Sequence, residues 1–280
     1  MLNRQETSPL PPGRVDLWYA SVENAVARGR IAAYRDSLPA DEVARADRYR
    51  QEKDRNCCLL ARALVRSVLS DYAGQDPADW TFRYNAHGKP SIAQPAGLSL
   101  NFNLSHTSGL VICGVASAGE LGVDVEHLSR AGEGDRHLLC EAPGTDRRLV
   151  GRAPTEGWSR QKVPVPFSLD LARRFFAASE IAFLEQAPPE RQPGLFLEFW
   201  TLKEAYIKAR GLGLSMPLAD FAFTLAGPQP PAIRFLRGGS GEAQQWRFAQ
   251  FCLCGAYQAA VALRPPGRED LSVRVQERCP

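Results

Sequence analysis

The stretch Leu121-Gly-Val-Asp-Val-Glu126 is the starting point for interpreting this chain. Its apolar residues alternate with a glycine and two acids, and this period of two predicts a β-strand. Asp124 and Glu126 should therefore project from the same face of that strand. Acids on a strand often form only the solvated face of a sheet. Two carboxylates on one face can also supply oxygen ligands to a hard divalent cation.

A second stretch, Phe199-Trp-Thr-Leu-Lys-Glu-Ala-Tyr-Ile-Lys208, has the period of a helix. Phe196, Trp200, Glu204 and Lys208 recur every four residues, which places them on one helical stripe. A Glu–Lys pair at this spacing is common on exposed helices, but here large apolar residues surround it. Charged groups among apolar neighbours need a partner. Three acids and a lysine in these two stretches indicate a divalent cation and a phosphate-bearing substrate.

The composition is that of a globular protein with one large or two modest domains. The chain has 280 residues, 44% of them hydrophobic. Its net charge of +3 is too small to indicate a nucleic-acid-binding protein. The seven cysteines lack the C-x-x-C spacing of a zinc site, which favours a reduced, cytoplasmic protein. No apolar run is long enough to cross a bilayer, so we expect no membrane partner.

The periodicity divides the chain into two parts, each of which runs roughly from helix to strands. Residues 129–168 lack periodicity and are rich in glycine, proline and charge, which predicts a loop insertion. The expected divisions are a flexible tail at 1–13, an N-terminal α+β half at 14–119, a C-terminal α+β half at 120–264, and a polar tail at 265–280.

A hairpin is expected just before the acid-bearing strand. Segments 98–104 and 110–116 predict two antiparallel strands joined by a turn that contains Ser105 and His106. A serine in a turn often caps the backbone, but the imidazole and the turn amides could also contact phosphate. The chain has neither a G-x-S-x-G nor a G-x-x-x-x-G-K-[ST] motif, so a hydrolase elbow and a P-loop are not indicated.

Three motifs in this order resemble the 4′-phosphopantetheinyl transferases of the larger, monomeric, surfactin-synthetase-activating type. They are Phe102-Asn-Leu-Ser-His106, Gly122-Val-Asp-Val-Glu126 and the stretch that ends at Lys208, which match F-N-x-S-H, G-x-D-x-E and F-W-x-x-K-E-x-x-x-K. Gly88-Lys89-Pro90 and Gly211-Leu-Gly-Leu214 support the match, which runs from about residue 15 to residue 263.

The resemblance implies an α+β fold of two similar, pseudo-duplicated halves with the active site in the cleft between them. It implies transfer of 4′-phosphopantetheine from coenzyme A to a serine of an apo acyl, peptidyl or aryl carrier protein, with release of adenosine 3′,5′-bisphosphate. The implied cofactor is Mg²⁺, with Mn²⁺ as a substitute, and the implied enzyme is a cytoplasmic monomer. The insertion is longer than is usual for the family, which leaves the carrier preference open.

The resemblance also implies a role for each matching residue. The metal ligands would be Asp124, Glu126 and Glu204, and the catalytic residues would be Glu204, Lys208 and Lys203. Coenzyme A would contact Arg45, Arg83, Lys89, Ser105, His106, Asp124 and Lys208. Two alternatives remain open, a non-catalytic coenzyme A- or nucleotide-binding module and a Mg²⁺-dependent phosphohydrolase.

Overall fold

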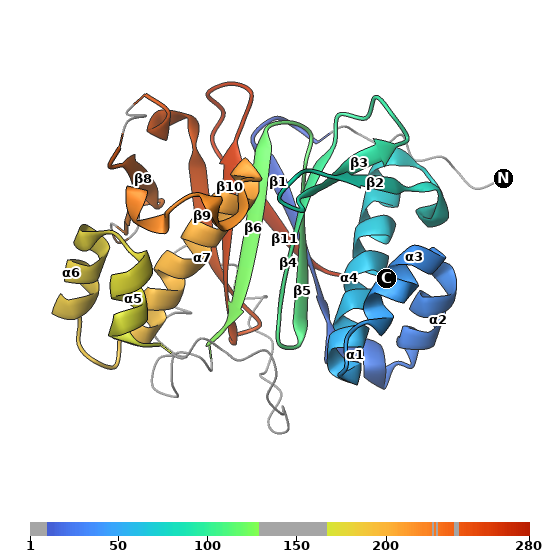
Figure 1. The fold of residues 1–280 in the computed structure, drawn as a ribbon. Coiled ribbons are helices and arrows are strands. Elements are labelled where there is room, and N and C mark those ends of the chain that lie inside the picture. Colours follow the sequence, from blue (N-terminus) through green and yellow to red (C-terminus); the bar gives the residue numbers. More distant parts are fainter. Residues whose placement is uncertain (1–9, 129–166, 226, 228, 238–240) are drawn as a thin grey trace.

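The described part of the chain consists of two main β-sheets that lie between two layers of helices (Figure 1). In this computed structural model the described residues are 10–128, 167–225, 227, 229–237 and 241–280. The first sheet has the order β11–β1–β5–β4 and the second the order β6–β10–β9. Their strands are β1 (Arg14–Ser21), β4 (Asn101–Thr107), β5 (Leu110–Ala116), β6 (Glu120–His127), β9 (Arg247–Leu253), β10 (Tyr257–Arg264) and β11 (Ser272–Glu277).

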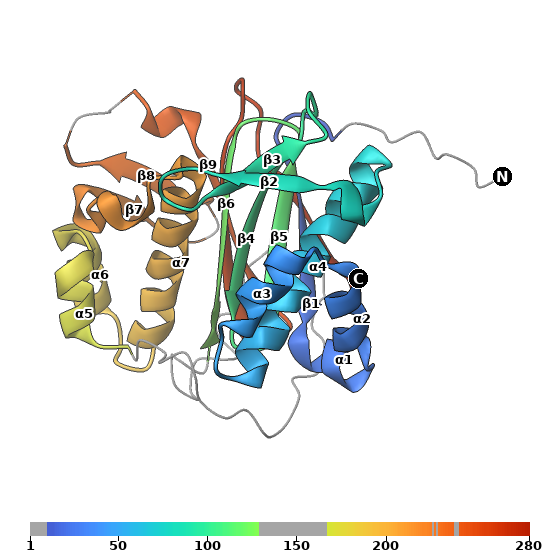
Figure 2. The ribbon, with the colours of Figure 1, turned by 45° about the vertical axis from the view of Figure 1, so that its right-hand side comes forward.

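The N-terminal helices cover the outer face of the first sheet. The longest is α4, whose apolar side packs on Val111, Cys113 and Val115 of β5. A small hairpin of β2 and β3 follows α4 and extends toward the end of α7 (Figure 2). The elements of this layer are α1 (Val22–Ala27), α2 (Arg30–Ser37), α3 (Ala40–Asp47), α4 (Glu52–Ala73), the 3₁₀ turn η1 (Pro77–Asp79), β2 (Thr81–Tyr84) and β3 (Pro90–Gln94).

The C-terminal helices cover the outer face of the second sheet. Tyr206 of α7 packs edge-on against Phe221 and Trp246 in an aromatic core, and Gly211, with φ 65°, ends the helix. The elements of this layer are α5 (Leu169–Phe175), α6 (Ala178–Gln186), α7 (Gln192–Arg210), β7 (Phe221–Thr224), β8 (Ala232–Phe235) and the 3₁₀ turns η6 (Gly213–Ser215), η7 (Leu218–Asp220) and η8 (Ala243–Gln245).

The two sheets pack on each other through the alternate apolar residues of their strands. Leu121, Val123 and Val125 of β6 lie in a buried cluster with residues of β1 and β5. This confirms the predicted alternation in β6. The intervening positions, Asp124 and Glu126, therefore lie on the opposite face of β6.

A glycine allows α7 to lie very close to β6. A Cβ atom added to Gly122 would lie 1.9 Å from the carbonyl oxygen of Ala205, which is far inside van der Waals contact. Gly122 shares its face of the strand with the two acids. The close approach therefore brings α7, which carries Glu204 and Lys208, against the acids of β6.

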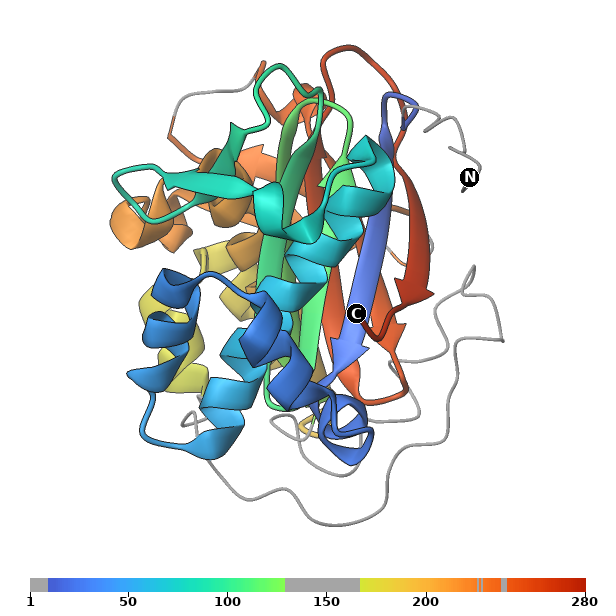
Figure 3. The same cartoon turned by 90° about the vertical axis from the view of Figure 1, so that its right-hand side faces the viewer.

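The prediction of a C-terminal tail at 265–280 is wrong. Within that range β11 pairs in parallel with β1, and the amide of Arg278 donates to the carbonyl oxygen of Tyr19 at 2.8 Å. Figure 3 shows the two strands side by side, although they come from opposite ends of the chain. The strand has mainly polar, partly exposed residues because it is a sheet edge, and this composition resembled that of a tail.

Two other predicted segments lie largely outside the described residues. These are the tail at 1–13, of which residues 10–13 are described, and the insertion at 129–168, of which only 167 and 168 are described. In the described part of the chain, no helix is both long and apolar enough to cross a membrane.

Candidate functional site at the junction of β4, β6 and α7

The site forms where the two sheets meet edge to edge, at β4 and β6. The amide of Val123 donates to Asn103 Oδ1 at 2.9 Å, and the amide of Val125 donates to Ser105 Oγ at 3.3 Å. Side chains of β4 thus accept hydrogen bonds from this edge of β6, whose other edge pairs with β10. Polar side chains are required here because buried amides need acceptors.

Ser105 and His106 lie in strand β4 and not in the turn that we predicted. They pair with Ile112 and Val111 of β5. Because residues alternate along a strand, Ser105 is buried on the side of β6 whereas His106 is exposed on the opposite side. The structure therefore brings Ser105, but not His106, to the two acids of β6.

Three polar groups meet at the centre of the site. Ser105 Oγ donates to Asp124 Oδ1 at 2.8 Å. Lys208 Nζ donates to the same carboxylate oxygen at 2.6 Å and to Ser105 Oγ at 2.8 Å. The other oxygen of Asp124, Oδ2, is buried and has no hydrogen-bond partner. The carboxylate therefore has two donors on one oxygen and none on the other, which is unusual for a buried polar group.

Glu204 is a carboxyl group whose ionisation is strongly disfavoured. Burial, together with the charges of Asp124 and Glu126, raises its pKa to about 7, and Lys208 opposes that shift only in part. Glu126 itself accepts a hydrogen bond from Thr107 Oγ1 at 3.2 Å. The three acids predicted from the sequence thus interact electrostatically across the contact between β6 and α7.

Asp124, Glu126 and Glu204 are not arranged as a complete set of metal ligands in this structure. Among the described residues, no three His, Cys, Asp or Glu side chains are arranged so that they could hold a metal ion. The orphaned Asp124 Oδ2 and the raised pKa of Glu204 both fit a cation, because a positive charge would satisfy the first and reverse the second. Carboxylate oxygens are also the ligands that Mg²⁺ prefers.

A cavity of about 290 Å³ opens beside these groups. Glu204, Ile207 and Lys208 of α7 form one wall, and Asn103 and Leu104 of β4 contribute to another. The β2–β3 turn and the glycines after α7 complete it, with His87, Gly88, Lys89, Pro90, Gly211 and Gly213. The cavity is therefore lined by elements from both parts of the chain.

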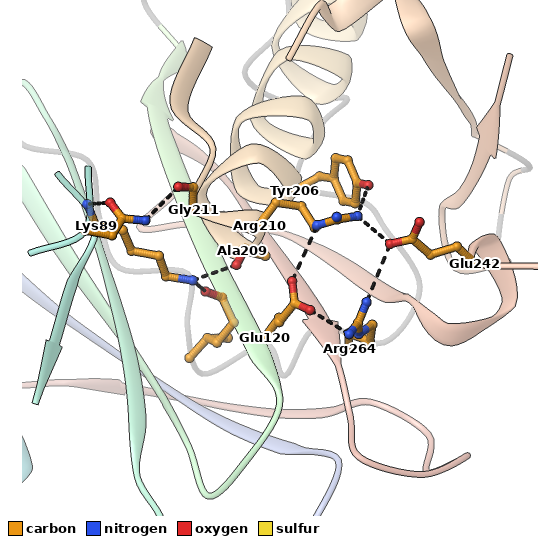
Figure 4. A network of polar contacts seen from close by, with 10 residues as sticks. Lys89, Glu120, Tyr206, Ala209, Arg210, Gly211, Glu242 and Arg264 are labelled. Carbon is orange, nitrogen blue, oxygen red and sulfur yellow. Dashed lines mark hydrogen bonds and ion pairs between the residues drawn. The ribbon is translucent and has the colours of Figure 1, made fainter. Parts of the chain in front are cut away.

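The β2–β3 turn is fastened to the end of α7. Lys89 Nζ donates to the carbonyl oxygens of Ala209 at 2.6 Å and Leu121 at 3.1 Å, and Asn85 Nδ2 donates to that of Gly211 at 2.7 Å (Figure 4). Burial lowers the pKa of Lys89 to about 8. We predicted that Lys89 contacts coenzyme A, but the structure places its ammonium on two backbone carbonyls.

We expect Lys89→Met to lower the free energy of unfolding at pH 7 by about 1–3 kcal/mol. The substitution keeps the apolar stem but leaves two partly buried carbonyl oxygens without a donor. Urea unfolding of the variant, compared with the wild type, measures the effect. Equal midpoints for the two proteins would mean that the clamp between β3 and α7 contributes nothing to stability.

Charged residues also surround the C-terminal end of α7, on the side away from Lys89. Arg210 lies between Glu242 and Tyr206, and Arg264 bridges Glu120 and Glu242 (Figure 4). These ion pairs join the end of α7 to the start of β6 and the end of β10. They hold together the helix end on which Lys208 stands, and sequence analysis gave no indication of them.

Lys203 does not reach the acids, and its predicted catalytic placement is wrong. Its side chain is fully buried, and Nζ donates to the carbonyl oxygens of Leu218 at 2.8 Å and Phe221 at 2.7 Å. It also lies 2.8 Å from Glu180 Oε2. Neighbouring residues on a helix point about 100° apart, so Lys203 and Glu204 serve different sides of α7.

Arg45 and Arg83 lie around β2, and neither lines the cavity. The Arg45 guanidinium stands 5.6 Å above the ring of Tyr84, whose hydroxyl also accepts from Arg62 at 3.0 Å. Arg83 Nε donates to Ser91 Oγ at 3.1 Å within the hairpin. The structure does not bring these two arginines to the carboxylates.

The sequence analysis missed Asn103 and Thr107 as parts of the site. Both lie on β4 on the same side as Ser105, and both bond to β6. The alternation of Asn103, Ser105 and Thr107 was a usable signal, since polar residues at every second position predict one polar strand face. We placed Asn103 in the strand but Ser105 and Thr107 in the turn, which hid that signal.

Comparisons with known proteins place two segments of the chain in one family. Residues 27–118 match the family described as "4′-phosphopantetheinyl transferase, N-terminal", and residues 155–262 match the "4′-phosphopantetheinyl transferase superfamily". Strand β6, with Asp124 and Glu126, falls between the two matched segments.

Several curated proteins are similar along much of the chain. The 4′-phosphopantetheinyl transferase HetI of Nostoc sp. (strain PCC 7120) is 28% identical over 233 residues, which is 81% of this chain and 83% of HetI. The transferase psf-1 of Bacillus pumilus is 27% identical over 240 residues, or 86% of this chain and 84% of psf-1. Sfp of Bacillus subtilis (strain 168) is 30% identical over 178 residues, or 64% and 62%.

Proposed function

The chain belongs to the 4′-phosphopantetheinyl transferase superfamily, and on that premise we propose that it transfers 4′-phosphopantetheine from coenzyme A to a serine hydroxyl of an apo carrier protein. The observation that carries the proposal is the grouping of Asp124, Ser105 and Lys208 beside Glu204 at the wall of a cavity. This grouping offers carboxylates for a metal ion and a cation for phosphate.

The residues at the cavity have distinct roles in this proposal. Asp124, Glu126 and Glu204 would hold Mg²⁺, and a bound Mg²⁺ neutralises charge on the diphosphate oxygens. Glu204 would also accept the proton of the carrier serine, because its carboxylate lines the cavity that this serine would enter. Lys208 binds the diphosphate and stabilises the leaving phosphate.

The reaction balances without any further reagent. The serine oxygen bonds to the phosphorus nearer the pantetheine, and the bond from that phosphorus to the bridging oxygen breaks. Adenosine 3′,5′-bisphosphate leaves with the electron pair, and the serine proton passes to Glu204. Little covalent chemistry is asked of the protein, which supplies position and charge.

The proposal extends to the arrangement of the two parts of the chain. We regard them as two pseudo-duplicated α+β halves of a monomer, with coenzyme A in the cleft between them. Lys89 and Ser105 are close to the cavity and remain candidates for contact with coenzyme A. Arg45, Arg83 and His106, on the N-terminal side, remain candidates for its 3′-phosphate end.

The products formed with and without a carrier test the proposal against the two alternatives. In the presence of Mg²⁺, we expect adenosine 3′,5′-bisphosphate to form from coenzyme A only when an apo carrier protein is present. The amount of nucleotide released should equal the amount of carrier modified. Release of the nucleotide without a carrier would support a phosphohydrolase. Coenzyme A binding without any product would support a binding module.

A further inference from the structure

The ammonium group of Lys208 already forms an ion pair with the carboxylate of Asp124. Its ammonium donates to Asp124 Oδ1 at 2.6 Å and to Ser105 Oγ at 2.8 Å. The Lys208 side chain is 29% exposed, whereas that of Asp124 is only 6% exposed. The lysine can therefore swing toward the cavity that it lines, while the carboxylate is fixed by the strand and by Ser105.

An ammonium and a divalent cation cannot easily share this carboxylate. Both would lie within contact distance of a group that is mostly buried, where charge repulsion is poorly screened. In the present position of Lys208, part of the negative charge of the acids is already balanced by its ammonium. The free oxygen Asp124 Oδ2 alone is a weak site for a divalent ion.

From this geometry we propose that Lys208 and the divalent cation exchange at Asp124: the lysine is an internal counter-ion that a metal ion displaces. The proposal rests on the proposed function and deepens it. The displaced ammonium stays on α7 at the cavity wall, one helical turn from Glu204, where an anionic diphosphate is its natural partner. Metal binding and delivery of Lys208 to the substrate would then be one coupled event.

The exchange predicts opposite effects of one substitution on two measurements. Lys208→Met should bind Mn²⁺ at least about tenfold more tightly than the wild type in the absence of coenzyme A. The substitution removes the ammonium that competes with the metal ion for contact with Asp124. The same variant should lose transfer. Mn²⁺ binding is measured by the electron paramagnetic resonance of the free ion, with Lys53→Met as the matched control on α4, which should equal the wild type.

Unchanged or weaker Mn²⁺ binding by a folded Lys208→Met protein would overturn the exchange. Adding Asp124→Asn to Lys208→Met should remove the gain, and a gain that survives would place the ion elsewhere and overturn the proposal as well. Because these measurements need no carrier protein, they separate the exchange from the proposed function. Tighter Mn²⁺ binding without transfer by the wild type would leave the exchange standing and remove the transferase proposal.

A measurement on the wild type covers the case in which Lys208→Met does not fold. The chain has five lysines, so the ¹³Cε signals of labelled lysine are few, and Lys208→Arg identifies the signal of Lys208. We expect Mg²⁺ to shift that signal while the Lys53 signal stays fixed. A Lys208 signal that does not move at saturating Mg²⁺ would contradict the exchange.

Discussion

Glu204→Gln is expected to abolish transfer and, in the absence of metal, to stabilise the fold at pH 8. Glutamine keeps the shape of the side chain but cannot ligate a cation as a carboxylate or accept the serine proton. The loss should exceed about a hundredfold, the usual contribution of a general base. The gain in stability has a separate physical origin.

The stability gain follows from the pKa of Glu204, which is raised from 4.5 to about 7 in the folded protein. Because the folded state holds the proton more tightly, the wild type loses stability as pH rises from about 4.5 to about 7 and stays level above that. Glutamine has no proton to lose. The variant should therefore be up to about 3 kcal/mol more stable than the wild type at pH 8, with the difference fading toward pH 4.5.

Urea unfolding in EDTA at pH 5 and pH 8 measures the change in stability, and transfer assays with Mg²⁺ measure the loss of activity. Glu190→Gln, an exposed position before α7, is the matched control and should change neither. A Glu204→Gln protein that is folded and still active would remove Glu204 from the chemistry. A protein that is less stable at pH 8 would mean that the carboxylate stabilises the metal-free fold.

The second large effect is expected at Lys203, on stability. Lys203→Met should lower the free energy of unfolding by about 3–5 kcal/mol, because it leaves the buried carboxylate of Glu180 without its ammonium. Burial lowers the pKa of Lys203, and Glu180 opposes that shift. The carboxylate of Glu180 also accepts hydrogen bonds from the backbone amides of Ala177 and Phe223. The Glu180–Lys203 pair therefore joins α6 and β7 to α7.

A double-mutant cycle separates the ion pair from the packing around it. Glu180→Gln with Lys203→Met removes both charges, so it should be less destabilised than the sum of the single variants by about 1–3 kcal/mol. Additive losses would mean that the two charges do not interact.

The sequence was most informative where a local pattern determines the direction of a side chain. The alternation in β6 correctly predicted a common face for Asp124 and Glu126, and the helical spacing correctly predicted that Glu204 and Lys208 lie one turn apart. Both patterns depend on the regular geometry of one element, which a single stretch of sequence contains.

Contacts between distant segments could not be predicted in this way. Glu180, the partner of Lys203, comes from a separate helix, and no spacing links the two residues. Lys89 is held by carbonyl groups of β6 and α7, which any residue could supply. Strand β11 was missed because its order comes from pairing with β1 and not from its own composition.

Intact-protein mass spectrometry of an apo carrier protein tests the central claim most directly. The carrier is incubated with this protein, coenzyme A and Mg²⁺, with one sample in EDTA and another containing Glu204→Gln in place of the wild type. We predict that the wild type adds the mass of one phosphopantetheine group, and that the EDTA and Glu204→Gln samples gain nothing. No gain on any of several apo carriers, despite measurable binding of coenzyme A, would contradict the assignment as a transferase.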